Sequence, residues 1–163
     1  ESSDKKKLVM FRKTGETWKE DDEDSLGPRP FIIDLSRFTS LKKLEKIGFD
    51  QYWEDKMGFK VINPVKITKL KSIKNIHINE SKFSSEDLIK IRKITVGPRD
   101  NFLKTCQKKD ESIKYEFDLS AKDRKKYDIL DREIRFGDFY RFYDSWGGTD
   151  IDSILEQRKK KKN

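Results

Sequence analysis

The pattern that decides the predicted fold lies in residues 59–79, which read FKVINPVKITKLKSIKNIHIN. β-Branched and aromatic residues stand here at mostly even spacing, with lysines between them and a break at Asn63-Pro64. Alternate side chains of an extended chain point to opposite faces, and β-branched residues suit such a surface. The segment therefore predicts two or three antiparallel strands with one apolar face and one basic face.

Two other segments are predicted to be strands. Residues 31–35 form a short apolar run after a proline, as expected of a buried strand. Residues 112–119 alternate between apolar and mainly charged side chains, which is the pattern of a strand with one face on the core. These strands and those of residues 59–79 make up the small antiparallel sheet that we predict. No internal repeat of 20–50 residues is found.

Capping residues and periodic apolar residues predict short helices around this sheet. Apolar residues recur at threefold spacing from Leu41 to Ile47, Gly48 follows as a stop signal, and Thr39 or Ser40 would cap the helix. The fold class is therefore α+β, with a small antiparallel sheet packed by four or five short helices and with disordered termini. The other helices are expected after Ser84 or Ser85 through Ile94, after Asp100, after Ser120 to about Ile134, and after Thr149 or Asp150.

Length and composition allow one domain with appended tails. The chain has 163 residues, of which 33% are hydrophobic and 42% charged, whereas an average soluble domain is roughly 25% charged. The apolar residues suffice for one modest core. We expect residues 1–30 to be a flexible basic and acidic segment, residues 31–156 to form a single α+β domain, and residues 157–163 to be a basic tail.

Composition also excludes several classes of site. Cys106 and His77 are the only residues of their types, so the chain holds no disulfide framework, multi-cysteine metal site or His-pair zinc site. Asp34, Glu54 and Lys56 would mimic a metal-dependent nuclease, but their spacing matches no strong motif. We therefore expect no catalytic residues, no metal and no cofactor. No stretch approaches the ~20 consecutive apolar residues of a membrane span, so no membrane partner is expected.

The positive charge of the chain is unevenly placed. Lys and Arg outnumber Asp and Glu by 38 to 30, and residues 61–110 alone carry a net charge of +7 out of the total of +8. A clustered excess is typical of a face that binds polyanions. The alternative is a solvated surface that only keeps the protein soluble. The choice depends on whether basic side chains from separate segments converge on one face.

The candidate nucleic-acid-binding residues are basic residues of this central region. Lysine suffices to neutralise phosphates, whereas readout of bases favours Arg, Asn and Gln, so the scarcity of arginine indicates weak sequence specificity. The predicted function is a non-catalytic module that binds DNA, RNA or chromatin in the nucleus. A lone cysteine fits a reducing compartment, and the basic residues 158–162 suit nuclear import. The candidate set is Lys66, Lys69, Lys71, Lys74, Lys90, Arg92, Lys93 and Arg99.

The alternative function is a protein–protein interaction module of a larger nuclear assembly. Residues 136–146 contain six aromatic residues, which serve either as anchors for a partner or as core. Their spacing also fits one stripe of a helix. The acidic residues 20–24 would then mask the basic face or meet a basic partner. The candidate partner-binding residues are Trp18, Trp53, Phe139, Tyr140, Tyr143 and Trp146.

Overall fold

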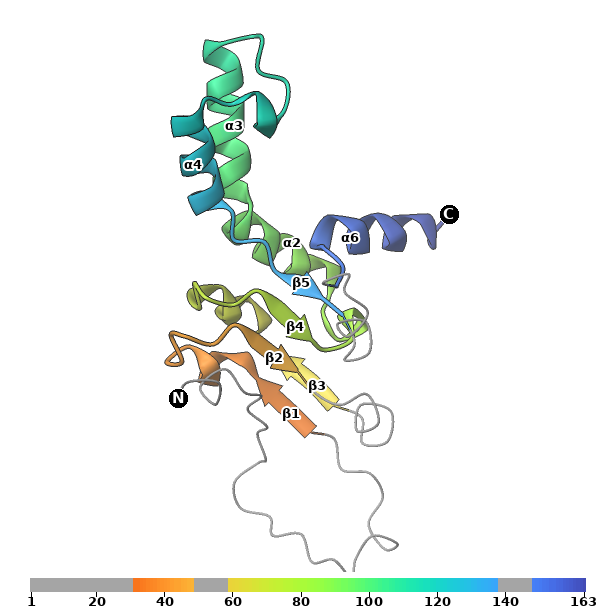
Figure 1. Ribbon diagram of the computed structural model, residues 1–163. Coiled ribbons are helices and arrows are strands. Elements are labelled where there is room, and N and C mark those ends of the chain that lie inside the picture. The colour runs from red at the N-terminus through yellow and green to blue at the C-terminus, as the bar shows by residue number, and fades with distance from the viewer. Residues whose placement is uncertain (1–30, 49–58, 138–147) are drawn as a thin grey trace, which may run out of the picture.

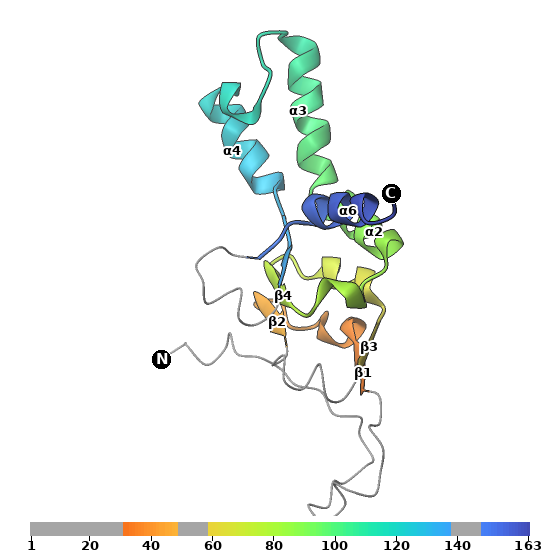
Figure 2. The same ribbon diagram turned by 90° about the vertical axis from the view of Figure 1, so that its right-hand side faces the viewer.

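A computed structural model describes residues 31–48, 59–137 and 148–163 (Figure 1). The elements, in which η denotes a 3-10 helix, are β1 (Phe31–Asp34), η3 (Leu35–Phe38), β2 (Lys46–Gly48), β3 (Phe59–Ile62), η4 (Pro64–Lys69), β4 (Asn75–His77), η5 (Glu80–Lys82), α2 (Ser85–Thr95), α3 (Gly97–Lys109), η6 (Glu116–Asp118), α4 (Ala121–Leu130), β5 (Arg135–Phe136) and α6 (Ile151–Lys160). The strands, α2 and α6 form a body, from which α3 and α4 project as an arm (Figure 1 and Figure 2). Among the described residues, none of the helices has the length and apolar character that crossing a membrane requires.

The strands are parallel, so the predicted antiparallel sheet is wrong. β1 pairs with β3 in one sheet, and a second sheet has the order β2-β4-β5. In Figure 1, η3 and η4 lie at the same end of the two sheets, where each turns the chain from one sheet into the other. Parallel neighbours need such crossover connections, whereas an antiparallel pair needs only a tight turn.

The parallel pairing follows from a repeat in the chain. Phe31 stands opposite Phe59 and Lys46 opposite Asn75, so equivalent residues lie 28 and 29 positions apart. At this spacing residues 38–49, FTSLKKLEKIGF, match residues 67–78, ITKLKSIKNIHI, in the placing of their apolar residues. The expectation of no internal repeat is therefore wrong, because the chain passes twice through a strand, a 3-10 helix, a turn and a second strand.

The predicted helix from Thr39 or Ser40 to Gly48 is also wrong. A turn follows η3, and β2 begins at Lys46. Leu44 is buried as predicted, but it lies at the end of a turn and not in a helix. The carbonyl oxygens of Lys42 and Leu44 accept a hydrogen bond from Ser72 of the second pass, instead of from N–H groups one helical turn further along.

Residues 112–119 do not form the predicted strand. The Asp118 carboxylate accepts hydrogen bonds of 2.9 Å from the backbone N–H groups of Lys114 and Tyr115, and η6 follows. A local cap of this kind competes with strand pairing. Tyr115 and Phe117 are exposed, Ile113 is half-buried, and only Leu119 of these four alternating apolar residues is buried.

Three of the predicted helix caps are confirmed, whereas Asp100 lies inside α3 and does not cap it. The side chains of Ser84, Ser120 and Asp150 each accept a hydrogen bond from the backbone N–H three residues further along. α3 begins at Gly97, earlier than predicted. α4 ends at Leu130, short of its predicted end, and this leaves the next residues free to pair as β5.

The buried side chains form two separate clusters. The main core lies in the body and includes Phe83 and Phe136, whose rings meet edge to face with centroids 4.9 Å apart. Phe136 therefore belongs to a strand and to the core, and not to a helical aromatic stripe. The arm encloses a much smaller cluster of its own, formed by Cys106, Leu119 and Tyr127.

Replacing Gly48 by alanine is expected to lower the free energy of unfolding by about 1–3 kcal/mol, because the close approach of β2 to β4 leaves no room for the added methyl group. A Cβ at Gly48 would overlap the Cβ of His77 on the paired strand and lie 2.8 Å from the His77 carbonyl oxygen. Gly97→Ala is the matched control, since a Cβ there meets nothing within 4 Å. Urea unfolding of both variants checks this. A Gly48→Ala protein as stable as the parent would show that β2 and β4 do not pair in this register.

Candidate nucleic-acid interface

Three connections meet at one end of the sheet that contains β2, β4 and β5. Because the strands are parallel, the segments that precede them reach the same edge. The Ser72 hydroxyl lies 2.8 Å from the carbonyl oxygens of Lys42 and Leu44 and donates to them. The Lys74 N–H donates to the Glu45 carbonyl oxygen at 2.9 Å. The turn before β2 therefore lies directly against the turn before β4.

A cluster of six lysines, termed here the lysine edge, stands on these turns and on η4. Lys66 and Lys69 are three residues apart in η4, a spacing at which side chains of a 3-10 helix stand above one another. All six side chains are exposed, and within the described residues none has a carboxylate at ion-pair distance. The lysine edge comprises Lys42, Lys43, Lys66, Lys69, Lys71 and Lys74.

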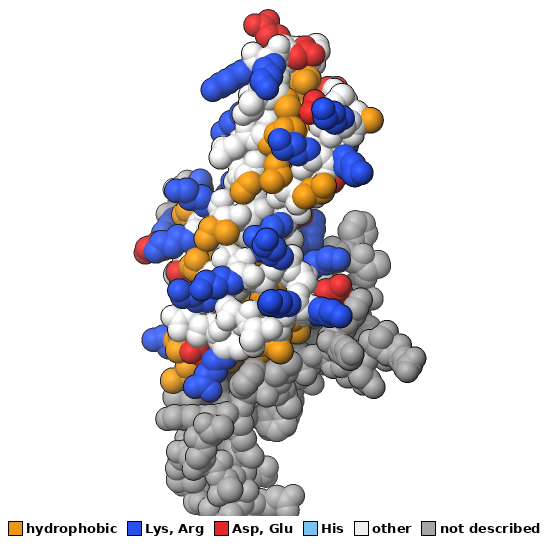
Figure 3. All heavy atoms as spheres, turned by 90° about the vertical axis from the view of Figure 1, so that its left-hand side faces the viewer, with side chains coloured by type: hydrophobic (Ala, Val, Ile, Leu, Met, Phe, Trp, Pro, Cys, Tyr) orange, Lys and Arg blue, Asp and Glu red, His pale blue; other side chains and the backbone are white. Residues whose placement is uncertain are grey.

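The two segments of sequence that carry the lysine edge contain little opposing charge. Residues 59–79 contain five lysines and no acidic residue, and residues 35–48 contain a single acid, Glu45. Figure 3 faces the side on which η4 lies in Figure 1 and shows Lys and Arg side chains gathered over both body and arm, with few Asp and Glu between them. This side therefore carries a positive potential that attracts polyanions.

Arg132 joins the arm to the lysine edge. Its Nη2 donates to the carbonyl oxygens of Thr68 at 2.6 Å and Leu70 at 3.3 Å, which flank Lys69. Burial lowers the pKa of Arg132 from its ordinary value, but a guanidinium stays charged at neutral pH. The connection between α4 and β5 is thus held against the end of η4.

Four of the eight predicted nucleic-acid-binding residues lie together on the lysine edge, namely Lys66, Lys69, Lys71 and Lys74. Lys93 is exposed on α2 and has no carboxylate partner in the described part of the chain. The other three predicted residues are held by carboxylates and so attract a phosphate less. Their partners are Glu86 for Lys90 at 2.7 Å, Asp100 at 2.9 Å and Asp152 for Arg92, and Asp131 for Arg99 at 2.8 Å.

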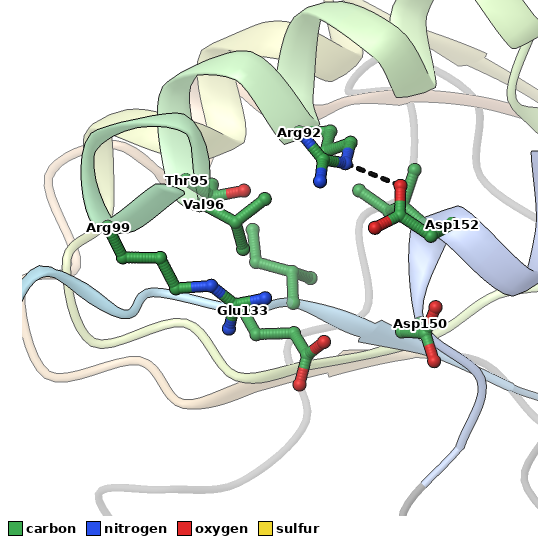
Figure 4. A pocket seen from close by; sticks show the side chains of 9 residues that line it. Arg92, Thr95, Val96, Arg99, Glu133, Asp150 and Asp152 are labelled. Atoms are coloured by element: carbon green, nitrogen blue, oxygen red, sulfur yellow. Dashed lines mark hydrogen bonds and ion pairs between the residues drawn. The ribbon is translucent and has the colours of Figure 1, made fainter. Parts of the chain in front are cut away.

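The two paired arginines belong to a junction between body and arm. Arg92 and Arg99 line a small cavity together with Glu133, Asp150 and Asp152 (Figure 4). Its volume is about 10 Å³, room for one water molecule at most and for no ligand. The ion pairs at this cavity join α2, α3 and α6, so their role is to fix the direction of the arm.

Sequence reasoning missed two members of the lysine edge, Lys42 and Lys43. They lie outside the segment of highest charge, and a helix was predicted there. The signal that finds them is the repeat: at a separation of 29 residues Lys42 corresponds to Lys71, which sequence reasoning did select.

His77 adds no charge to this surface at neutral pH. Burial, together with the nearby Lys46, lowers the pKa of His77 to about 4. The imidazole is therefore neutral above that pH. The positive potential of the body comes from lysine and arginine alone.

Other predicted residues take no part in the lysine edge. One Asp34 carboxylate oxygen accepts hydrogen bonds from the Ser36 N–H, the Ser36 hydroxyl and the Asn63 amide at 2.6–3.0 Å, which lower the pKa of Asp34 and fix the end of β1. Within residues 31–48, 59–137 and 148–163, no three His, Cys, Asp or Glu side chains are grouped to hold a metal ion. The remaining candidates lie outside the described residues: Glu54 and Lys56 of the nuclease-like set, and the partner-binding residues Trp18, Trp53, Phe139, Tyr140, Tyr143 and Trp146.

Comparison of the chain with protein-family models, with curated protein sequences and with solved structures finds no match.

Proposed function

We propose that the protein is a non-catalytic nucleic-acid-binding module that holds phosphates with the lysine edge. The observation that carries this proposal is the convergence of lysines from two separate turns and η4, without neutralising carboxylates among the described residues. Neighbouring like charges repel one another in the free protein. A phosphate backbone removes that repulsion and releases its own condensed counterions on binding.

The proposed binding has little sequence specificity. Lysine presents a point charge, whereas the common specific contacts to guanine and adenine need the paired donors and acceptors of Arg, Asn or Gln. Two arginines beside the lysine edge are already engaged: Arg132 donates to backbone carbonyls, and Arg135 contacts Gly148 and Glu133. We therefore propose that the ligand is DNA or RNA of many sequences, or chromatin.

A nuclear location belongs to the same proposal. α6 ends in a basic run in which Lys159, Lys161 and Lys162 are exposed and have no carboxylate partner among the described residues. Short basic runs of this kind serve as nuclear import signals or as nonspecific anion contacts. Import of a fluorescent fusion, and its loss when the run is replaced by glutamine, tests this part alone.

One observation favours protein docking as a second function. Tyr115 and Phe117 are stacked on each other with ring centroids 5.1 Å apart, and they are 57% and 70% exposed. Exposed aromatic side chains often anchor protein partners. Phe117 lies in η6 of the arm and Tyr115 directly precedes it, away from the lysine edge, so the two functions are separable by mutation.

Binding of a fluorescent duplex at several salt concentrations tests the proposal. If about five phosphates are neutralised, the logarithm of the binding constant should fall with the logarithm of salt with a slope near −4.5, a loss of roughly 500-fold between 50 and 200 mM. Submicromolar binding at 50 mM salt with such a slope supports the proposal. Absence of binding at 50 mM salt, or a slope near zero, would remove it.

A further inference from the structure

The outer face of α4 carries a second row of lysines. Lys122, Lys125 and Lys126 are exposed at positions i, i+3 and i+4, whereas Tyr127 points into the small core of the arm. Residues three and four apart on a helix stand on the same face. The three ammonium groups therefore form one stripe, termed here the α4 stripe.

Nearby acids are occupied by other groups. Asp128 pairs with Arg124 at 3.1 Å, and the Asp123 carboxylate accepts a hydrogen bond from the Ser120 hydroxyl at 3.0 Å. No lysine of the α4 stripe has a carboxylate at ion-pair distance among the described residues. One of them, Lys126, lies over the Phe102 ring at 5.0 Å, a contact that leaves its charge intact.

α4, which carries the α4 stripe, and η4, which carries part of the lysine edge, lie on the same side of the molecule in Figure 1. α4 ends one residue before Asp131, and Arg132 then contacts the end of η4. Figure 3 shows basic side chains over both arm and body on the side that it faces. The pairs Arg99–Asp131 and Arg92–Asp100 fix the direction of the arm, so this surface is formed before a ligand binds.

We infer that the α4 stripe is a second contact zone for the same ligand, which is therefore an extended duplex and not a short oligonucleotide or a compact phosphorylated molecule. This inference rests on the proposed function. The 10 residues of α4 span about 15 Å. A duplex carries one charge per ~1.7 Å, so several phosphates beyond those at the lysine edge come within reach of the stripe.

The test compares two duplex lengths and two variants. A hairpin stem of about 4 base pairs is about 14 Å long at 3.4 Å per pair, no longer than α4, so it cannot cover the lysine edge and the α4 stripe together, whereas a duplex of about 24 base pairs reaches both. The test variant replaces Lys122, Lys125 and Lys126 by glutamine, which forms helix as readily as lysine. The matched control replaces Lys108, Lys109 and Lys114 by glutamine and so has the same net charge as the test variant. These three lysines stand among Asp110, Glu111 and Asp118 at the arm tip.

On the long duplex, the test variant should bind at least about tenfold more weakly at low salt, with a salt slope smaller by about 2.7, and the control should stay close to the parent. On the short duplex all three proteins should bind alike. An unchanged slope on the long duplex, or an equal loss on the short one, would overturn the inference and leave the proposed function standing. Failure of the parent protein to bind either duplex would overturn both.

Discussion

Glutamine at all six positions of the lysine edge is expected to weaken duplex binding by more than about 100-fold at 50 mM salt, because each lost phosphate contact removes one released counterion. The fold should stay intact, since the six side chains are exposed and have no carboxylate partner in the described part of the chain. Binding is measured by fluorescence anisotropy, and the fold by circular dichroism. On a duplex too short to reach the α4 stripe, the salt slope of the variant should fall toward zero.

The matched control for this variant removes the same charge elsewhere. Glutamine at Lys104, Lys108, Lys109, Lys114, Lys161 and Lys162 lowers the net charge equally without touching the lysine edge or the α4 stripe. This control should keep most of the affinity. If both variants lose affinity equally, net charge and not a defined surface controls binding, and the lysine edge has no special role.

Phe136→Ala is expected to lower the free energy of unfolding by about 3–5 kcal/mol, the usual cost of removing a fully buried phenyl ring. Phe136 has no exposed surface, lies opposite Ile76 in the parallel sheet and meets Phe83 edge to face. The loss is measured by urea unfolding. In a domain of this size it is a large share of the total stability.

Phe117→Ala is the control for that prediction. Phe117 is 70% exposed and stacks on Tyr115, so removal of its ring should cost less than about 1 kcal/mol. The two variants together distinguish the observed fold from the strand predicted for residues 112–119. In that strand Phe117 would face the core. A larger loss for Phe117→Ala than for Phe136→Ala would contradict the fold described above.

Local features of this fold could be predicted from the sequence because they depend on neighbouring residues. The caps at Ser84, Ser120 and Asp150 need only a side-chain oxygen and an N–H three residues further along. The strand at residues 31–34 follows from an apolar run after a proline. In residues 112–119 the local signal failed because another local interaction was stronger, namely the cap that Asp118 makes within the predicted strand.

The direction of the strands could not be predicted from alternation, because the same pattern fits parallel and antiparallel neighbours. Parallel pairing is recognised only through the repeat at 28–29 residues, which the different polar residues of the two passes conceal. When the repeat is not recognised, the sequence around Lys42 and Lys43 predicts a helix where the structure has a turn. For the same reason these two members of the lysine edge are absent from the predicted binding residues.

Charge counting located four of the six residues of the lysine edge. It selected Lys66, Lys69, Lys71 and Lys74, which lie close together in sequence. It also selected Arg92, whose partner Asp152 is 60 residues away along the chain and is not visible to a count of charge per segment. Neutralisation by distant carboxylates is a property of the fold, so sequence alone overestimates how many basic residues are available to a ligand.

Mapping of the bound duplex by NMR tests the central claim most directly. A titration of the ¹⁵N-labelled protein with a short duplex should shift the amide signals of residues 41–45 and 66–74 together and along one binding curve. These two segments are joined by Ser72, so a ligand on the lysine edge must perturb both. Shifts confined to the C-terminal basic run, to η6 of the arm, or spread evenly over all basic residues would contradict the claim that the lysine edge binds nucleic acid.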